Sequence, residues 1–372
     1  MAAQKKLKIL LLADPLANAK HWINGLEQYG DAEVTNWHLN QTGRIKRTLE
    51  WITMLLTIKK KVKRFAPDII IGYRLTSYGF LAAWSGYHPC VIAAQGITDV
   101  WPQNHWTTPF KALLARYAIK HADKIHAWGQ HMTDSIVHYG ASPSQLFVLP
   151  RGIDLGIFYP VQKQYIKGQK INMCVTRALF PEYGHMVILK ALKLLVDNGY
   201  DISLAIAGNG TELENLQSFV KKNGLSEHVS FLGYVPNGEL PELLRRSDIY
   251  ISMPDTEGVS ASLLEAMGCG CLPIVSDLPA NRAFIIDGKN GYLVEVGNEQ
   301  MLFDKIKTTL NNESIFNNAI LENIQYIKQN TSLKKNMQLF GAMYRRLIQN
   351  NNSINTNNTN EKKDPDYRVV SR

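Results

Sequence analysis

The chain alternates short apolar runs with longer stretches of helical periodicity. In its first part, apolar runs bounded by turn residues occupy 8–13, 66–73, 89–94, 123–129 and 146–150. Between the first two runs, residues 20–30 repeat their apolar positions with the spacing of a helix. Alternation of this kind predicts βαβ units that share a parallel sheet.

A second series follows the polar stretch 161–170. Its apolar runs occupy 171–177, 203–208, 229–233, 248–253, 272–277 and 291–296, and its helical patterns 182–200, 211–225 and 239–247. After residue 300 the pattern is only helical, and beyond Gln349 too little apolar surface remains to offset the entropy of ordering. We therefore predict two Rossmann-type α/β domains, a helical end and a disordered tail.

The clearest helical pattern is expected from about Glu182 to Asn198. Its apolar residues recur at intervals of three and four and form one buried stripe, made of Val187, Ile188, Ala191, Leu194 and Leu195. Asn198 and Gly199 supply a left-handed stop.

Composition narrows the class of partner. The 372 residues, 45% of them hydrophobic, are enough for two domains. A net charge of +9 favours anionic partners and leaves nucleotides, nucleic acid and anionic membranes open. No stretch reaches the roughly 18 uninterrupted apolar residues of a membrane span.

The cysteines and histidines indicate neither disulfides nor a metal centre. Cys90, Cys174, Cys269 and Cys271 lack paired spacing, which favours a reducing, cytoplasmic setting. The ten histidines form no cluster at ligand spacing, so we expect no metal. Cys269 and Cys271 flank Gly270 in a helix-ending turn and are expected to pack.

A glycine-containing turn follows one strand of the second series. Gly208-Asn209-Gly210 would let backbone approach a ligand, and Thr211 could cap the next helix with Glu214 as its capping-box partner. An ordinary strand-to-helix turn explains the same residues.

Two glutamates bracket a short helix after the strand 248–253. Glu257 lies in the loop before this helix, and Glu265 stands about two turns farther along the chain. Ligands of doubly wound folds bind at the carboxyl ends of strands. The small or β-branched side chains of Gly258, Val259 and Ser260 leave helix-start amides exposed to an anion such as a diphosphate. Surface glutamates around a buried helix are the alternative.

The stretch "EGVSASLLEAMGCGCLPIVSD" (257–277) resembles the signature of the retaining glycosyltransferases of family 4. "VLPRGIDLGIFYP" (148–160), "VTRALFPEYG" (175–184) and "IDGKNGYLVEVGN" (286–298) are similar to further landmarks of that family, in the same order. The resemblance implies a B-type glycosyltransferase fold, with two facing Rossmann-like domains, the nucleotide sugar on the second and the acceptor mainly on the first.

The polar stretch 161–170 predicts a domain boundary near residue 165, and the resemblance implies that the last helix returns to the first domain. The first domain would span 1–165 and the nucleotide-sugar-binding domain 166–330, followed by a helix at 331–350 that crosses back to the first domain. The remaining residues, 351–372, would form the disordered tail.

Site roles follow from the resemblance by position. Glu257 resembles the glutamate near the donor sugar, and Glu265 the one that holds the ribose. Gly258, Val259 and Ser260 match the phosphate and sugar contacts, and Arg177 matches an arginine on the diphosphate. The family implies transfer without a metal or other cofactor.

Two positions depart from the family pattern. Tyr183 stands where a lysine is usual, so one positive charge on the diphosphate is missing. In the first domain, Gln95 stands where histidine is common, beside Gly96 and Asp99. We expect these three residues on the acceptor side, although Asp99 could simply cap its loop.

Basic residues gather in the first domain around the apolar stretch 49–58, and a second basic helix is expected at 110–124, just after Trp101 and Trp106. Such a surface fits anionic lipid headgroups, and a solvated helix face is the alternative. No binding motif accompanies the charge to favour nucleic acid.

The sequence thus favours a cytoplasmic, membrane-peripheral retaining glycosyltransferase. It would move a hexosyl or N-acetylhexosaminyl group from a UDP or GDP sugar to a glycan or lipid-linked acceptor, in cell-surface polysaccharide synthesis. A nucleotide-sugar-binding protein with little activity is the alternative, suggested by Tyr183 and Gln95. A dehydrogenase would need GxGxxG after the first strand, and residues 10–21 lack it.

Overall fold

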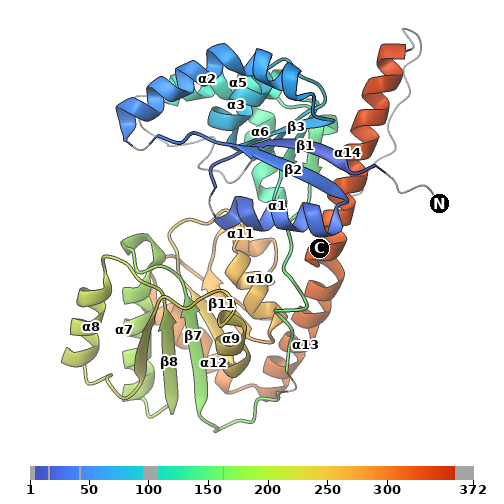
Figure 1. Cartoon of the computed structure of the whole chain (residues 1–372). Helices are drawn as coiled ribbons and strands as arrows, with labels where there is room; N and C mark the ends of the chain where they lie inside the picture. The colour runs from blue at the N-terminus through green and yellow to red at the C-terminus, as the bar shows by residue number, and fades with distance from the viewer. Residues whose placement is uncertain (1–4, 16, 42, 95–107, 162, 357–372) are drawn as a thin grey trace. The chain divides into compact units, whose positions relative to one another are not determined.

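The computed structural model describes residues 5–15, 17–41, 43–94, 108–161 and 163–356. Contacts divide the chain into two compact units, one made of Met1–Arg151 with Leu333–Arg372 and the other of Gly152–Ser332. Figure 1 shows both units, each built around a sheet.

The first unit contains a six-stranded parallel sheet in the order β2-β1-β3-β4-β5-β6. Its strands are β1 (Leu7–Leu12), β2 (Ala32–Trp37), β3 (Ile69–Tyr73), β4 (Cys90–Ala94), β5 (Lys124–Ala127) and β6 (Leu146–Val148). Every residue of β3 and β4 is buried, as expected for strands covered on both faces.

The helices of the first unit flank this sheet (Figure 1). They are α1 (Ala17–Tyr29), α2 (Arg44–Phe65), α3 (Gly79–Trp84), α5 (Thr108–Lys120), α6 (Thr133–His138) and α14 (Leu333–Thr356). A π-helical turn, Arg74–Tyr78, joins β3 to α3.

The last helix, α14, packs on α1 in the first unit, which confirms the predicted return of the C-terminal helix. The Phe340 ring meets the Trp22 ring edge to face at 5.9 Å between centroids. Gly25 permits this approach, because a Cβ there would lie 3.0 Å from Cγ of Met337. The predicted tail beyond Thr356 lies outside the described residues.

The second unit contains a parallel sheet in the order β12-β11-β10-β7-β8-β9. Its strands are β7 (Ile171–Thr176), β8 (Ile202–Ala207), β9 (Val229–Gly233), β10 (Ile249–Ser252), β11 (Leu272–Ser276) and β12 (Tyr292–Val294). Its helices are α7 (His185–Asp197), α8 (Leu213–Lys222), α9 (Leu240–Arg246), α10 (Ala261–Gly268), α11 (Pro279–Arg282), α12 (Glu299–Leu310) and α13 (Glu313–Asn330).

This strand order places a topological switch point between β7 and β10. From β7 the chain proceeds outward through β8 and β9, and from β10 it proceeds in the opposite direction through β11 and β12. Ligands of doubly wound folds bind outside the carboxyl ends of the strands at such a point. The two predicted Rossmann-like sheets are thereby confirmed.

The helix predicted from Glu182 begins three residues later. Pro181–Tyr183 is a single 3₁₀ turn, and Gly184 takes a left-handed φ of 65° before α7 starts. The expected stripe is confirmed, since Ile188, Ala191 and Leu195 are buried, with Val187 and Leu194 packed partly against the same core. The stop after the helix is also confirmed, with Gly199 at φ 78°.

The predicted cap of the next helix is wrong. The helix α8 begins at Leu213, with Glu212 at the N-cap position and no side-chain capping bond. The Glu212 amide instead donates to the Leu179 carbonyl at 2.9 Å, so a neighbouring loop fixes this turn.

Candidate functional site

Two predicted site residues meet at the switch point of the second sheet. Arg177 directly follows β7, and Glu257 lies in the loop after β10. The two strands are hydrogen-bonded neighbours, with Ile249 opposite Met173. Residues 80 positions apart in the sequence therefore reach the same edge of one sheet.

Arg177 and Glu257 form a buried ion pair. The Arg177 Nη2 donates to Glu257 Oε2, and the two side chains are only 16% and 12% exposed. Burial, the largest single effect, lowers the pKa of Arg177, but the charge and hydrogen bond of Glu257 together with Tyr250 and Tyr183 raise the pKa overall. Arg177 is thus a fixed cation whose partner carboxylate is already in contact.

Tyr183 lies against the same guanidinium. The centre of the Arg177 guanidinium stands 4.8 Å from the centroid of the Tyr183 ring, within cation–π range. At the position where the family pattern has a lysine, this chain therefore places a ring that holds the arginine and adds no charge.

Three glycines let the loops of this site touch. A Cβ at Gly208 or Gly210 would lie 2.1 Å from the carbonyl oxygen of Arg177 or Leu179, and one at Gly184 would lie 2.1 Å from that of Met253. The glycine turn predicted to approach a ligand also has a packing reason, because it meets the loop that carries Arg177. Its donor contact stays a prediction.

The start of α10 lies directly after Glu257. Ser260 caps the helix and accepts from the Leu263 amide at 3.2 Å. The Gly258 amide donates to Glu257 Oε1 at 3.1 Å, so the acidic side chain folds back onto the loop that carries it. Val259 is partly buried against the core beneath.

Glu265 lies half-buried in the second turn of α10. The same helix carries Ser262, which accepts from the hydroxyl of the buried Tyr250 at 3.0 Å. The structure thus places both predicted glutamates on one short segment at the carboxyl edge of the sheet, while their separate roles stay predictions.

Sequence reasoning missed His185, which opens α7 beside Arg177. Its side chain is 3% exposed. Burial, and then the positive charge of Arg177, lowers the pKa of His185 to about 4, so the ring is neutral at physiological pH. The sequence around His185 gave no signal of its burial, because the burial depends on neighbouring loops that are distant in the sequence.

Sequence reasoning also missed an acidic centre in the first unit. Asp14, which follows β1, accepts from Arg47 Nη2 at 2.6 Å and from the Tyr78 hydroxyl at 2.6 Å. Burial raises the pKa of Asp14. The hydrogen bonds from Tyr78 and Arg47 together lower it by a larger amount, so the net effect is a lowered pKa. The π-helical turn that carries Tyr78 begins at Arg74, whose φ is 71°.

The predicted acceptor-side residues Gln95, Gly96 and Asp99 lie outside the described residues, as do Trp101 and Trp106. Within the described part of the chain, no group of three or more His, Cys, Asp or Glu side chains is placed to hold a metal. Cys269 and Cys271 are buried, and the Cys271 thiol donates to the Leu244 carbonyl at 3.0 Å.

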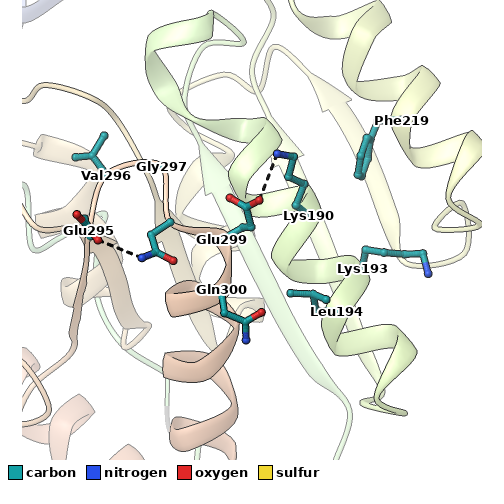
Figure 2. A pocket seen from close by; sticks show the side chains of 10 residues that line it. Lys190, Lys193, Leu194, Phe219, Glu295, Val296, Gly297, Glu299 and Gln300 are labelled. Atoms are coloured by element: carbon teal, nitrogen blue, oxygen red, sulfur yellow. Dashed lines mark hydrogen bonds and ion pairs between the residues drawn. The ribbon is translucent and has the colours of Figure 1, made fainter.

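A cavity of about 640 Å³ lies elsewhere in the second unit (Figure 2). It is lined by Lys190 and Lys193 of α7, Phe219 of α8 and the residues that lead into α12. Lys190 is paired with Glu299 at 3.3 Å. The cavity includes neither Arg177 nor Glu257, so it is separate from the candidate site.

Two Rossmann-like units, with an arginine and a glutamate at the switch point of the second, define a B-type glycosyltransferase fold. The chain belongs to the family of glycosyl transferases group 1, whose model matches residues 161–343. A second model, glycosyl transferase 4-like, matches residues 18–128.

Curated relatives are similar over part of the chain. A phosphatidyl-myo-inositol mannosyltransferase of Mycobacterium leprae is 36% identical over 36% of this chain and 35% of its own length. A GDP-mannose-dependent alpha-(1-6)-phosphatidylinositol monomannoside mannosyltransferase of Mycolicibacterium smegmatis is 32% identical over 40% of this chain and 42% of its own length. The chain therefore spans less than half the length of these relatives.

Solved structures share the fold over nearly the whole chain. The Anabaena protein HepE, in a crystal structure with UDP and glucose, superposes with a TM-score of 0.73 over 92% of this chain and 100% of that one, at 16% identity. Identity this low establishes the fold alone. Among the described residues, no helix has the length and apolarity needed to cross a membrane.

Proposed function

We propose that this protein is a retaining glycosyltransferase that moves a sugar from a nucleoside-diphosphate sugar to a glycan or lipid-linked acceptor. The observation that carries the proposal is the pairing of Arg177 with Glu257 at the switch point, directly before the start of α10. A fixed guanidinium and helix-start amides are the groups that a diphosphate requires.

In this reaction Arg177 acts on the leaving group. As the bond between the sugar C1 and the diphosphate oxygen breaks, negative charge grows on that oxygen, and the guanidinium stabilises it. The acceptor hydroxyl oxygen forms the new bond to C1, and the departing phosphate takes the hydroxyl proton. The rate rises because this stabilisation is larger in the transition state than in the bound donor.

The two glutamates bind different parts of the donor. Glu257, in contact with Arg177, lies next to the transferred sugar and accepts from its hydroxyls. Glu265, farther along α10, accepts from the ribose, while Gly258, Val259 and Ser260 present the backbone that faces the phosphates and sugar. Gly208, Gly210 and Tyr183 complete the donor side, and Gln95, Gly96 and Asp99 the acceptor side.

The names of the similar proteins support a UDP or GDP sugar as donor and a lipid-linked acceptor. They do not decide between uridine and guanosine. One relative is named for GDP-mannose and a phosphatidylinositol monomannoside, and the fold relative was solved with UDP and glucose. Such an acceptor favours a place at the inner face of a membrane, in cell-surface glycan synthesis.

A transfer assay tests the proposal. Purified chain is incubated with a nucleotide sugar and membrane lipid extract, and release of nucleoside diphosphate and labelling of lipid are followed. We expect turnover with retention of anomeric configuration, and a loss of at least about a hundredfold in Glu257→Gln. Equal turnover in that variant would contradict the assigned site.

A nucleotide-sugar-binding protein with little activity is the second candidate. The observation that favours it is Tyr183, which contributes no charge to the diphosphate. This candidate predicts that a nucleotide sugar binds with full affinity while no acceptor in the lipid extract is labelled.

A further inference from the structure

An exposed apolar row runs along the helix α2 of the first unit. Ile45, Leu49, Ile52 and Leu56 are 78%, 60%, 43% and 79% exposed. Their spacing of four, three and four positions places all four on one face of the helix. Single exposed apolar residues are ordinary, but a contiguous row marks a contact surface.

The opposite face of α2 accounts for its packing within the fold. Ile58 and Val62 are fully buried there. The Trp51 ring stacks on Phe80 at 5.8 Å between centroids, and Trp84 Nε1 donates to the Leu55 carbonyl at 3.1 Å. The apolar row is therefore separate from the core-facing side of the helix.

Positive charge surrounds the row. Lys63 follows Leu56 by seven positions and so continues the same face, while the Lys59 ammonium lies 4.9 Å from the centroid of the Trp84 ring. The flanks carry further exposed basic residues, Lys46, Lys60 and Arg64. The helix holds one acidic residue, Glu50, whose carboxylate accepts from the amides of Asn40 and Gln41 at 2.9 and 2.8 Å.

We propose that this surface, made of the apolar row and its flanking lysines, docks on an anionic lipid bilayer. A surface helix with an apolar face and Lys-rich flanks lies in the plane of the headgroups, where its apolar side chains enter the acyl boundary and its cations meet lipid phosphates. This proposal rests on the proposed function in one respect, the lipid-linked acceptor, which docking would bring near the first unit.

Charge argues against a second copy of the chain as the occupant. Basic residues stand at both ends of α2, with Lys46 near its start and Lys60, Lys61, Lys63 and Arg64 near its end. Pairing two such helices in either direction would bring like charges together. A lipid surface of opposite charge removes this repulsion.

Vesicle co-sedimentation of the full chain tests the surface. The vesicles are phosphatidylcholine alone or phosphatidylcholine mixed with phosphatidylglycerol. We expect binding to the anionic vesicles that weakens with salt and falls about tenfold or more in the double variant Leu49→Ser/Leu56→Ser. Lys60→Glu/Lys63→Glu should lose binding to a similar extent.

Matched variants in the second unit serve as controls. Leu321→Ser removes a leucine that is 66% exposed on α13. Lys221→Glu/Lys222→Glu reverses two exposed charges on α8. Both control variants should bind the vesicles as the wild type does.

Three results would overturn the proposal: no binding to anionic vesicles, equal binding by wild type and Leu49→Ser/Leu56→Ser, or a lipid-free dimer that this double variant dissociates. Titration with UDP and GDP on the same preparations separates the two claims. Nucleotide binding without vesicle binding overturns the docking surface and leaves the proposed function standing, whereas vesicle binding without nucleotide binding does the reverse.

Discussion

Arg177 is the centre of the candidate site at the scale of single residues. Its guanidinium contacts Glu257 on one side and lies over the Tyr183 ring on another. Both partners hold the arginine in place, so the diphosphate of the proposed donor would meet an oriented guanidinium and lose little free energy to side-chain ordering. With Tyr183 in place of a lysine, the proposed donor site relies on Arg177 and the backbone amides for its positive charge.

Replacement of Tyr183 tests this distribution of charge. Tyr183→Lys adds an ammonium beside the diphosphate and loses a cation–π contact, so we expect the affinity for nucleoside diphosphate to rise about three- to tenfold in calorimetric titration. Tyr183→Phe keeps the ring and should bind as the wild type does. A correctly folded Tyr183→Lys with unchanged or weaker affinity would argue against a diphosphate next to this residue.

The buried neutral ring of His185 makes stability depend on pH. Its pKa is about 4 in the fold, against about 6.5 in the unfolded chain, so the unfolded chain binds more protons between these values. The stabilisation is complete above pH 6.5 and is lost as the pH falls toward 4, by about 3 kcal/mol. In denaturant titrations, His185→Leu should reduce the pH dependence over this window, while the buried His126, whose pKa is also lowered to about 4, retains its share.

The exposed His138 provides the control for this measurement. His138→Leu should keep the slope of the wild type between pH 6.5 and 4. If His185→Leu also keeps that slope, then the burial of His185 does not produce it.

Glu257 was predictable as a site candidate because ligands of doubly wound folds bind at the carboxyl ends of strands, whereas Arg177 became a candidate only through the family resemblance. Their ion pair was not predictable, since it joins positions 80 residues apart. The contact of Tyr183 with Arg177 follows from the short turn before Gly184, which the sequence pattern merged into the helix.

At the scale of elements, glycines set how closely the loops of the second unit approach. Gly184 combines a φ of 65° with a Cβ position 2.1 Å from the Met253 carbonyl oxygen. The loop after β10 is thereby held against the start of α7, and the Asp255 amide donates to the Glu182 carbonyl at 2.9 Å.

Alanine at Gly184 should therefore damage both stability and the site. The Gly184→Ala variant must move the Met253 loop, so we expect a loss of at least about 3 kcal/mol in unfolding free energy and weaker nucleotide binding. Gly199→Ala is the matched control, because φ is 78° but no atom lies within 4 Å, and it should cost about 1–2 kcal/mol. Equal losses in chemical denaturation would refute the importance of the close approach.

Element types were predictable where the apolar period was clear, as in the fully buried β3 and β4 and the stripe of α7. Element ends were less so. The start of α8 was misread because the Glu212 amide bonds to the Leu179 carbonyl of another loop, a contact that local capping residues do not encode.

At the scale of the whole molecule, the chain leaves the first unit after Arg151 and returns to it at Leu333. The sequence placed the domain boundary at the polar stretch near residue 165, and the boundaries at 165 and 330 stay predictions. Tyr165 itself is tied to the second unit, since its hydroxyl donates to the Leu310 carbonyl at 2.8 Å. A contact across 145 positions leaves no local pattern.

Titration of the full chain with UDP, GDP and their sugar conjugates tests the central claim, a donor site at the switch point of the second unit. We predict that one of the two nucleotides binds, that Arg177→Ala weakens this binding about tenfold or more, and that Glu257→Gln retains it. Arg246→Ala, which changes an arginine that is 78% exposed, should leave the affinity unchanged. Absence of nucleotide binding, or equal affinity in wild type and Arg177→Ala, would contradict the claim.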